Sequence, residues 1–316
     1  MFSMARLTVI AIATVVLSGT AFAAGKIPIF VSIVPQKDFV QQIGKGLVDV
    51  QVMVPPGASP HIYEPKPAQM IAVAKARLYF AIGVGYEKAW LPKIAAVNPQ
   101  MRVVHTDHGI RKIPMQAHHH EEDAHHEEAE HAAEQGRSTM TDEDALASHP
   151  HKGGQPDPHI WLSPPLVMTQ ARTILGVLQA VDPAHRALYE DNYNAFISRI
   201  VQLDRELRDL FSGRQGLQFM VFHPAWGYFA HAYGLRQVPI ELEGKDPKPA
   251  ELQGLIEHAR GSGIRVIFVQ PQFSTKSAAL VAKAIGGQVV FADPLAADWF
   301  ANLRQVADKF NAALKP

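Results

Sequence analysis

The sequence predicts an α/β fold with mostly parallel sheets, arranged as two halves with a long helical segment between them. Short apolar runs rich in β-branched residues alternate with segments of helical periodicity, which is typical of parallel strands connected by helices. This alternation occurs twice, before and after a long helical segment at residues 183–211. The 316 residues suit about two domains, and the 47% hydrophobic content allows a sizeable core.

The first series occupies the N-terminal half of the chain. Its first strand is nearly continuous in apolar residues, and its second alternates Val48, Val50, Val52 and Val54 with other residues. We expect strands at 27–34, 48–54, 78–82 and 102–105, and helices at 35–43, 67–74, 87–97 and 164–181.

The long segment begins at Asp182-Pro183, a cap residue followed by proline at the first helical position. Its apolar residues repeat at helical spacing, and a continuous helix over 183–211 would be about 44 Å long. It is either one helix between the two halves or two helices in sequence.

The second series follows this segment and runs to the end of the chain. We expect strands at 219–222, 237–240, 266–269 and 289–291, and helices at 226–233, 249–261, 274–285 and 298–314. The predicted organisation is a lobe over 24–182, a linking helix over 183–213 and a second lobe over 214–316.

Residues 1–23 have the pattern of a cleavable signal peptide. Arg6 supplies the positive charge, 7–17 is an apolar run too short to span a bilayer, and Ala21-Phe22-Ala23 forms the cleavage motif. The alternative is an N-terminal membrane anchor or a buried helix. We expect export to the periplasm without a lipid anchor, because the chain has no cysteine to carry one.

Composition excludes several kinds of chemistry. The absence of cysteine excludes disulfides, thiolate metal sites and a cysteine nucleophile. Thirty basic and thirty acidic residues give a formal net charge of zero, which argues against a nucleic-acid partner.

Residues 114–156 interrupt the pattern, and we expect a solvated, mobile loop there. From 118 to 151 the loop has one base against ten acids, a formal charge of −9. No two of its histidines have the HExxH spacing of a metalloprotease. The loop is either a metal-gathering arm with weak sites or a solvated spacer. Its eight histidines are His118, His119, His120, His125, His126, His131, His149 and His151.

Three further histidines lie in proline-containing loops of the two halves: His61, His159 and His223. Neutral imidazole is the commonest protein ligand for metals, and three imidazoles suit Zn²⁺. Any one of them alone is more simply a hydrogen-bonded loop histidine. The candidate fourth ligand is Asp293, which follows the last strand; Glu64 is a weaker candidate, and water is another.

Five segments resemble the metal-ligand motifs of the cluster A-I solute-binding proteins, which deliver Zn²⁺ or Mn²⁺ to ABC importers. With the histidine-acidic loop, the chain is most similar to the periplasmic zinc-binding, ZnuA-like branch. The segments are GASPHIYEP at 57–65, DPHIWL at 157–162, FHPAWGYF at 222–229, ELEGKDP at 241–247 and DPL at 293–295.

The resemblance implies two α/β lobes joined by one rigid helix, with the metal in the cleft between them. It also implies three histidine ligands, His61, His159 and His223, and a carboxylate ligand, Asp293. Some zinc-type members have an acid directly before the first ligand, where this chain has Pro60. Zn²⁺ would be the transported ligand, the partner would be the membrane permease of an ABC importer, and we expect a monomer.

We expect no enzymatic turnover, because a site closed by three histidines and a carboxylate leaves no position for an activated water. Delivery of Mn²⁺ or Fe²⁺ is an alternative within the same class. A zinc metallohydrolase with Glu64 as its base, and a periplasmic zinc store without an importer, are the alternatives from other classes.

Overall fold

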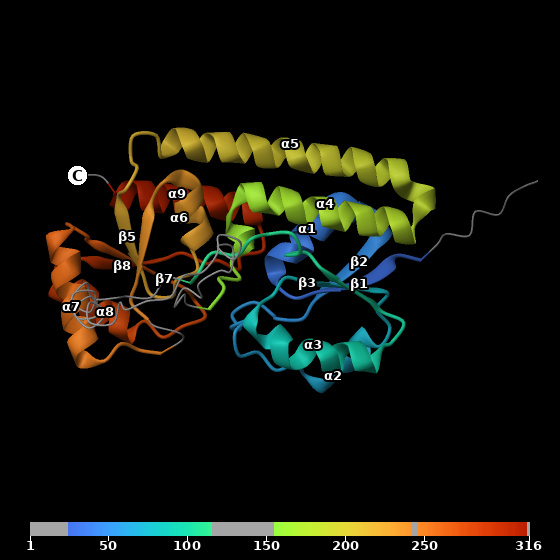
Figure 1. The fold of residues 1–316 in the computed structure, drawn as a ribbon, viewed down its shortest axis with the longest axis horizontal. Coiled ribbons are helices and arrows are strands. Elements are labelled where there is room, and N and C mark those ends of the chain that lie inside the picture. The colour runs from blue at the N-terminus through green and yellow to red at the C-terminus, as the bar shows by residue number, and fades with distance from the viewer. Residues whose placement is uncertain (1–24, 116–154, 242–244, 315–316) are drawn as a thin grey trace, which may run out of the picture.

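The computed structural model describes residues 25–115, 155–241 and 245–314, and confirms the predicted α/β fold. It contains two four-stranded parallel sheets, in the orders β2-β1-β3-β4 and β6-β5-β7-β8, with helices packed around them (Figure 1). The predicted signal peptide and the eight histidines of the acidic loop lie outside the described residues.

The first sheet consists of β1 (Ile27–Val31), β2 (Val48–Val52), β3 (Leu78–Ala81) and β4 (Arg102–His105). The second consists of β5 (Gln218–Val221), β6 (Arg236–Pro239), β7 (Val266–Val269) and β8 (Gln288–Phe291). The helices of the first half are α1 (Val34–Gly44), α2 (Pro67–Val73), α3 (Gly85–Val97) and α4 (Pro164–Val181). They are followed by α5 (Arg186–Leu210), α6 (Gly227–Tyr233), α7 (Pro249–Gly261), α8 (Lys276–Ala284) and α9 (Trp299–Ala313).

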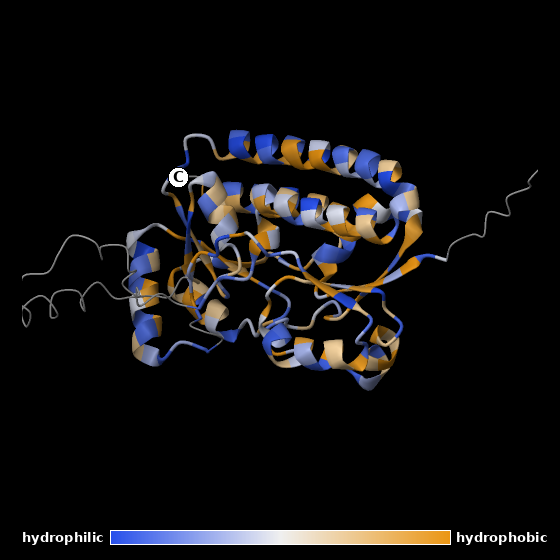
Figure 2. Ribbon diagram, turned by 45° about the vertical axis from the view of Figure 1, so that its right-hand side comes forward, coloured by the Kyte–Doolittle hydropathy of each residue, from blue (hydrophilic) through white to orange (hydrophobic). Residues whose placement is uncertain are grey.

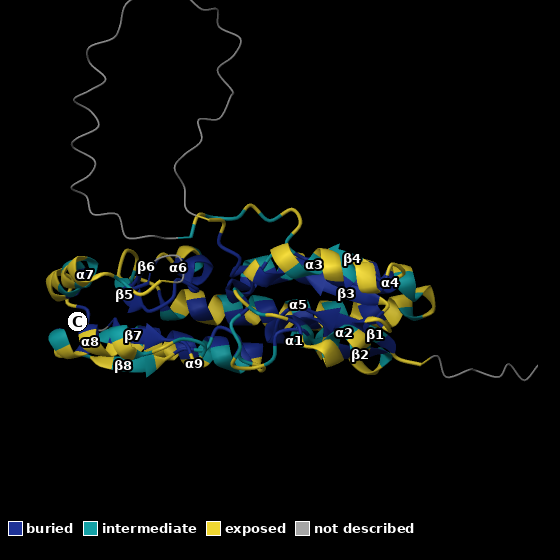
Figure 3. Cartoon of the chain, turned by 90° about the horizontal axis from the view of Figure 1, so that it is seen from below, coloured by how far each residue is buried: buried dark blue, intermediate teal, exposed yellow. Residues whose placement is uncertain are grey.

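The apolar pattern of each strand follows its place in the sheet. The inner strand β3 is buried at all four positions, as expected for a strand covered on both faces. The edge strand β2 alternates instead, with Val48 and Val50 buried and Asp49 and Gln51 exposed. Figure 2 shows the apolar residues concentrated in the strands and the inner helix faces, and Figure 3 shows the same regions as buried.

The long segment after residue 182 is one α-helix preceded by a short turn. A 3₁₀ turn at Pro183–His185 leads into the 25 residues of α5, which run along both halves (Figure 1). The buried residues of α5 recur at helical spacing, and one of them, Phe196, contacts Phe39 of α1 and Phe300 of α9. The helix therefore links the two halves by packing against both.

The two halves also share a continuous apolar core beneath α5. The indole of Trp161 donates to the carbonyl of Pro294, and the indole of Trp299 donates to the carbonyl of Trp161, each at 2.7 Å. The ring of Trp299 lies edge-on to that of Phe39, with 5.3 Å between centroids. Because these contacts are buried, separating the halves would expose apolar surface to water and break the two indole hydrogen bonds.

In the described part of the chain, no helix has the length and apolarity needed to cross a lipid bilayer.

Candidate metal centre

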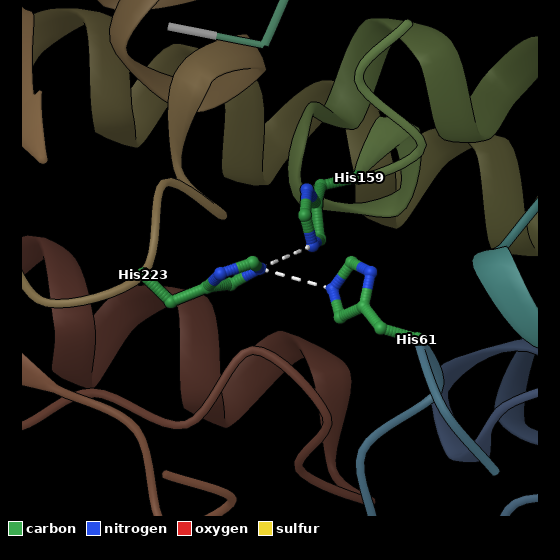
Figure 4. A group of neighbouring side chains, drawn as sticks. All are labelled: His61, His159 and His223. Carbon is green, nitrogen blue, oxygen red and sulfur yellow. Dashed lines mark hydrogen bonds between the residues drawn. The ribbon is translucent and has the colours of Figure 1, made fainter. Parts of the chain in front are cut away.

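His61, His159 and His223, the three histidines singled out in the sequence, converge on one point between the two halves (Figure 4). The Nε2 atom of His223 lies 3.0 Å from Nε2 of His61 and 3.3 Å from Nε2 of His159. One nitrogen from each ring falls within 4.8 Å of the others. Among the described residues, this is the one group of at least three side chains whose ligand atoms are so close.

Each histidine comes from a different part of the fold. His61 lies in the loop between β2 and α2, and His223 lies two residues beyond the end of β5. His159 precedes the 3₁₀ turn Ile160–Leu162 that leads into α4. The site thus lies near the carboxyl ends of parallel strands, where α/β folds usually bind ligands.

Two of the rings are oriented by buried carboxylates. Nδ1 of His159 lies 2.7 Å from Oδ1 of Asp157, which also accepts the backbone N–H of His159 at 2.8 Å. Nδ1 of His223 pairs with Oε1 of Glu241. Each Nδ1–H is donated to a carboxylate, so the Nε2 lone pair is free to bind a metal. The carboxylate also makes the imidazole a stronger electron-pair donor to that metal.

Burial shifts the ionisation of the Asp157–His159 pair toward neutrality. It raises the pKa of the Asp157 carboxyl to about 7 and holds the pKa of His159 well below its usual value. A bound Zn²⁺ would reverse the effect on Asp157, because a nearby cation favours the carboxylate.

Neither Asp157 nor Glu241 stood out in the sequence as a functional residue. Asp157 lies two residues before His159, so its nearness was visible in the sequence. Glu241 opens the fourth of the resembling segments, but it is 18 residues from His223, and only the fold brings the two together.

His61 differs from the other two histidines, because its loop is held through the backbone and no carboxylate among the described residues orients its ring. Within the described residues, no hydrogen-bond partner is found for its Nδ1, unlike the Nδ1 atoms of the other two rings. The carbonyl of Pro60 accepts the N–H of Tyr86 at 3.0 Å, and Gly85 lies directly against His61. A Cβ atom on Gly85 would be 2.8 Å from the carbonyl oxygen of His61 and 3.1 Å from its Cα.

Burial, and then the neighbouring rings of His159 and His223, lower the pKa of His61 to about 2. The ring is therefore neutral at physiological pH, so a metal does not have to displace a charge-bearing proton from it. The 3.0 Å contact between Nε2 of His61 and Nε2 of His223 needs a hydrogen between the two nitrogens in the metal-free protein. His61 can supply it from Nε2 and move it to the unpaired Nδ1 when a metal binds.

Replacing Gly85 with alanine is expected to weaken zinc binding about tenfold, because the new methyl group would push the His61 backbone out of position. Isothermal titration of the metal-free protein measures the change. Gly176→Ala in α4 is the matched control, since its Cβ would meet open space. Equal affinities for the two variants would show that Gly85 does not position His61.

Asp293, the predicted fourth ligand, is not in the group formed by the three histidines. Its Oδ1 accepts hydrogen bonds from Nε2 of Gln272 and from the N–H of Leu295, both at 2.9 Å. Glu64, the weaker candidate, is exposed. The identity of the fourth ligand therefore stays a prediction.

A cavity of about 830 Å³ reaches two of the three histidines, His61 and His223. His61 and His223 lie on its wall together with Gln272 and Phe273, and the ring of Phe273 stacks on that of His223 at 4.6 Å. Three imidazoles with a side open to a cavity suit a borderline-soft divalent cation such as Zn²⁺, whereas Mn²⁺ prefers oxygen ligands.

Comparisons with known proteins agree with this chemistry. The family model "Zinc-uptake complex component A periplasmic" (ZnuA) matches residues 29–313. The chain is 28% identical to the high-affinity zinc uptake system protein ZnuA of Bacillus subtilis, over 85% of this chain and 79% of the relative.

Two solved structures of ZnuA are similar along most of the chain. A crystal structure of ZnuA superimposes with a TM-score of 0.78 and 39% identity, covering 92% of this chain and all of the other. A zinc-bound deletion mutant of ZnuA gives the same TM-score and identity, covering 92% of this chain and 99% of the other.

Proposed function

Because the chain belongs to the family of periplasmic zinc-uptake components, we propose that it binds Zn²⁺ in the periplasm and delivers it to the permease of an ABC importer. The family consists of solute-binding proteins of transport systems, so the metal is cargo and no turnover is expected. The monomeric state and the export signal at residues 1–23 belong to the same proposal.

The convergence of three Nε2 atoms carries the proposal. His159 and His223 are 2% and 4% exposed, and their carboxylate partners Asp157 and Glu241 are 1% and 2% exposed. Burying a carboxylate beside an imidazole costs solvation free energy unless a nearby positive charge compensates it. A divalent cation at the three Nε2 atoms would supply that charge. We propose His61, His159 and His223 as the metal ligands.

Asp293 or a water molecule completes the coordination in this proposal, and the two lobes are 24–182 and 214–316, linked by 183–213. The eight histidines between 118 and 151 would bind zinc weakly and raise its local concentration near the cleft.

Zinc titration of the full chain and of a variant lacking residues 117–151 tests the proposal. We expect one tight site in both proteins, and faster zinc accumulation by vesicles that contain the cognate importer when loaded protein is added. Loss of the tight site on deletion would place the primary site in the loop. Unchanged accumulation would favour a store without an importer.

The other candidates are less well supported by the site. Manganese delivery would be favoured by more oxygen ligands than three imidazoles and one carboxylate provide. A hydrolase would need a base beside the metal, and the proposed base Glu64 is exposed and stands outside the histidine group. Failure of the zinc-loaded protein to cleave a broad panel of esters, amides and phosphates would weigh against the hydrolase.

A further inference from the structure

Asp293 is held in place by contacts of both its backbone and its side chain. The carbonyl of Asp293 accepts from Nδ2 of Asn302 at 2.8 Å, which fixes the backbone. Its Oδ1 carries the two hydrogen bonds from Gln272 and Leu295. With its backbone and Oδ1 held in this way, the carboxylate lies outside the group formed by the three histidines.

Gln272 holds this carboxylate from the wall of the cavity that His61 and His223 also line. Its NH₂ group faces the carboxylate, because carboxylate oxygens accept hydrogen bonds and the amide NH₂ donates them. The amide oxygen, Oε1, is buried without a hydrogen-bond partner among the described residues. The amide is thus held through its NH₂ group and not through its oxygen.

We propose that Gln272 sets the metal preference of the centre by restraining Asp293 outside the three imidazoles. This inference rests on the proposed function, since it concerns which cation the same site takes. While Gln272 holds Asp293, the centre offers three nitrogen ligands and a position open to water. When the hydrogen bond from Gln272 is absent, Asp293 adds a carboxylate oxygen to the set.

The added oxygen changes the two affinities unequally. Imidazole-rich, low-coordinate sites suit Zn²⁺, and Mn²⁺ gains more from a hard carboxylate ligand. Removing the hydrogen-bond donor of Gln272 therefore improves Mn²⁺ binding relative to Zn²⁺ binding. This improvement requires the carboxylate of Asp293.

Titration of the full chain with Zn²⁺ and, separately, with Mn²⁺ tests the proposal in a double-mutant cycle. Gln272→Met keeps the side-chain length and removes the donor, and Gln272→Ala is the second variant. We expect the ratio of Mn²⁺ to Zn²⁺ affinity to rise about tenfold in both variants. In an Asp293→Ala background, the same substitutions should leave the ratio unchanged.

Gln155→Met is the matched control, because Gln155 lines the same cavity and makes no hydrogen bond to Asp293. Any binding at the acidic loop is common to all variants and cancels in the comparison. An unchanged ratio in both Gln272 variants would overturn the inference, as would a rise that persists without Asp293. Failure of the proposed function is distinguishable, because the unsubstituted protein would then lack a tight zinc site.

Discussion

Replacing His223 with alanine is expected to lower the zinc affinity about 100- to 1000-fold. Structural zinc sites with four ligands contribute about 10–16 kcal/mol, so one ligand accounts for roughly 2.5–4 kcal/mol. His223 is the ring whose Nε2 contacts both other rings, at 3.0 Å and 3.3 Å, so its loss also removes the centre of the group. Competition with a chelator of known affinity measures the change.

His231→Ala is the control for this experiment, since His231 is an exposed histidine of α6 in the same half of the molecule. We expect it to bind zinc like the unsubstituted protein. Circular dichroism of both variants separates loss of a ligand from loss of the fold. If His223→Ala keeps the tight site while remaining folded, the three histidines are not the primary centre.

Replacing Glu241 with glutamine is expected to weaken zinc binding about tenfold or more. The substitution keeps the size of the side chain and one acceptor for Nδ1 of His223, but removes the buried negative charge. That negative charge makes the imidazole a stronger electron-pair donor to the metal and offsets part of the positive charge of the cation. The same titration measures the effect.

Glu64→Gln provides the contrast, because Glu64 is an exposed acid three residues from a proposed ligand. Its zinc affinity should match that of the unsubstituted protein. A large loss for Glu64→Gln with none for Glu241→Gln would identify Glu64 as the fourth ligand and remove the role given to Glu241.

Local patterns predicted most of the fold. The predicted helix at 164–181 matches α4 in both bounds, because a proline begins it and the apolar residues keep helical spacing throughout. Periodicity also located the long segment, but it could not decide between one helix and two. The structure has a single α5 because its apolar face packs against α1, α4 and α9 together.

The contacts that tune the centre depend on tertiary structure and were not predictable from one sequence. The three histidines could be found, since imidazoles in proline-containing loops are visible locally. The pairing of His223 with Glu241 and the close approach of Gly85 to His61 join distant segments. The hydrogen bond from Gln272 to Asp293 likewise joins residues 21 positions apart. Asp293 could be recognised in the sequence as a candidate ligand, but its hydrogen bond to Gln272 could not.

A structure of the zinc-loaded protein with anomalous scattering recorded at the zinc absorption edge would test the central proposal most directly. We predict one strong anomalous peak bonded to Nε2 of His61, His159 and His223, at about 2.0–2.1 Å from each. A fully occupied peak elsewhere, with the three Nε2 atoms still unbound, would contradict the proposed metal centre.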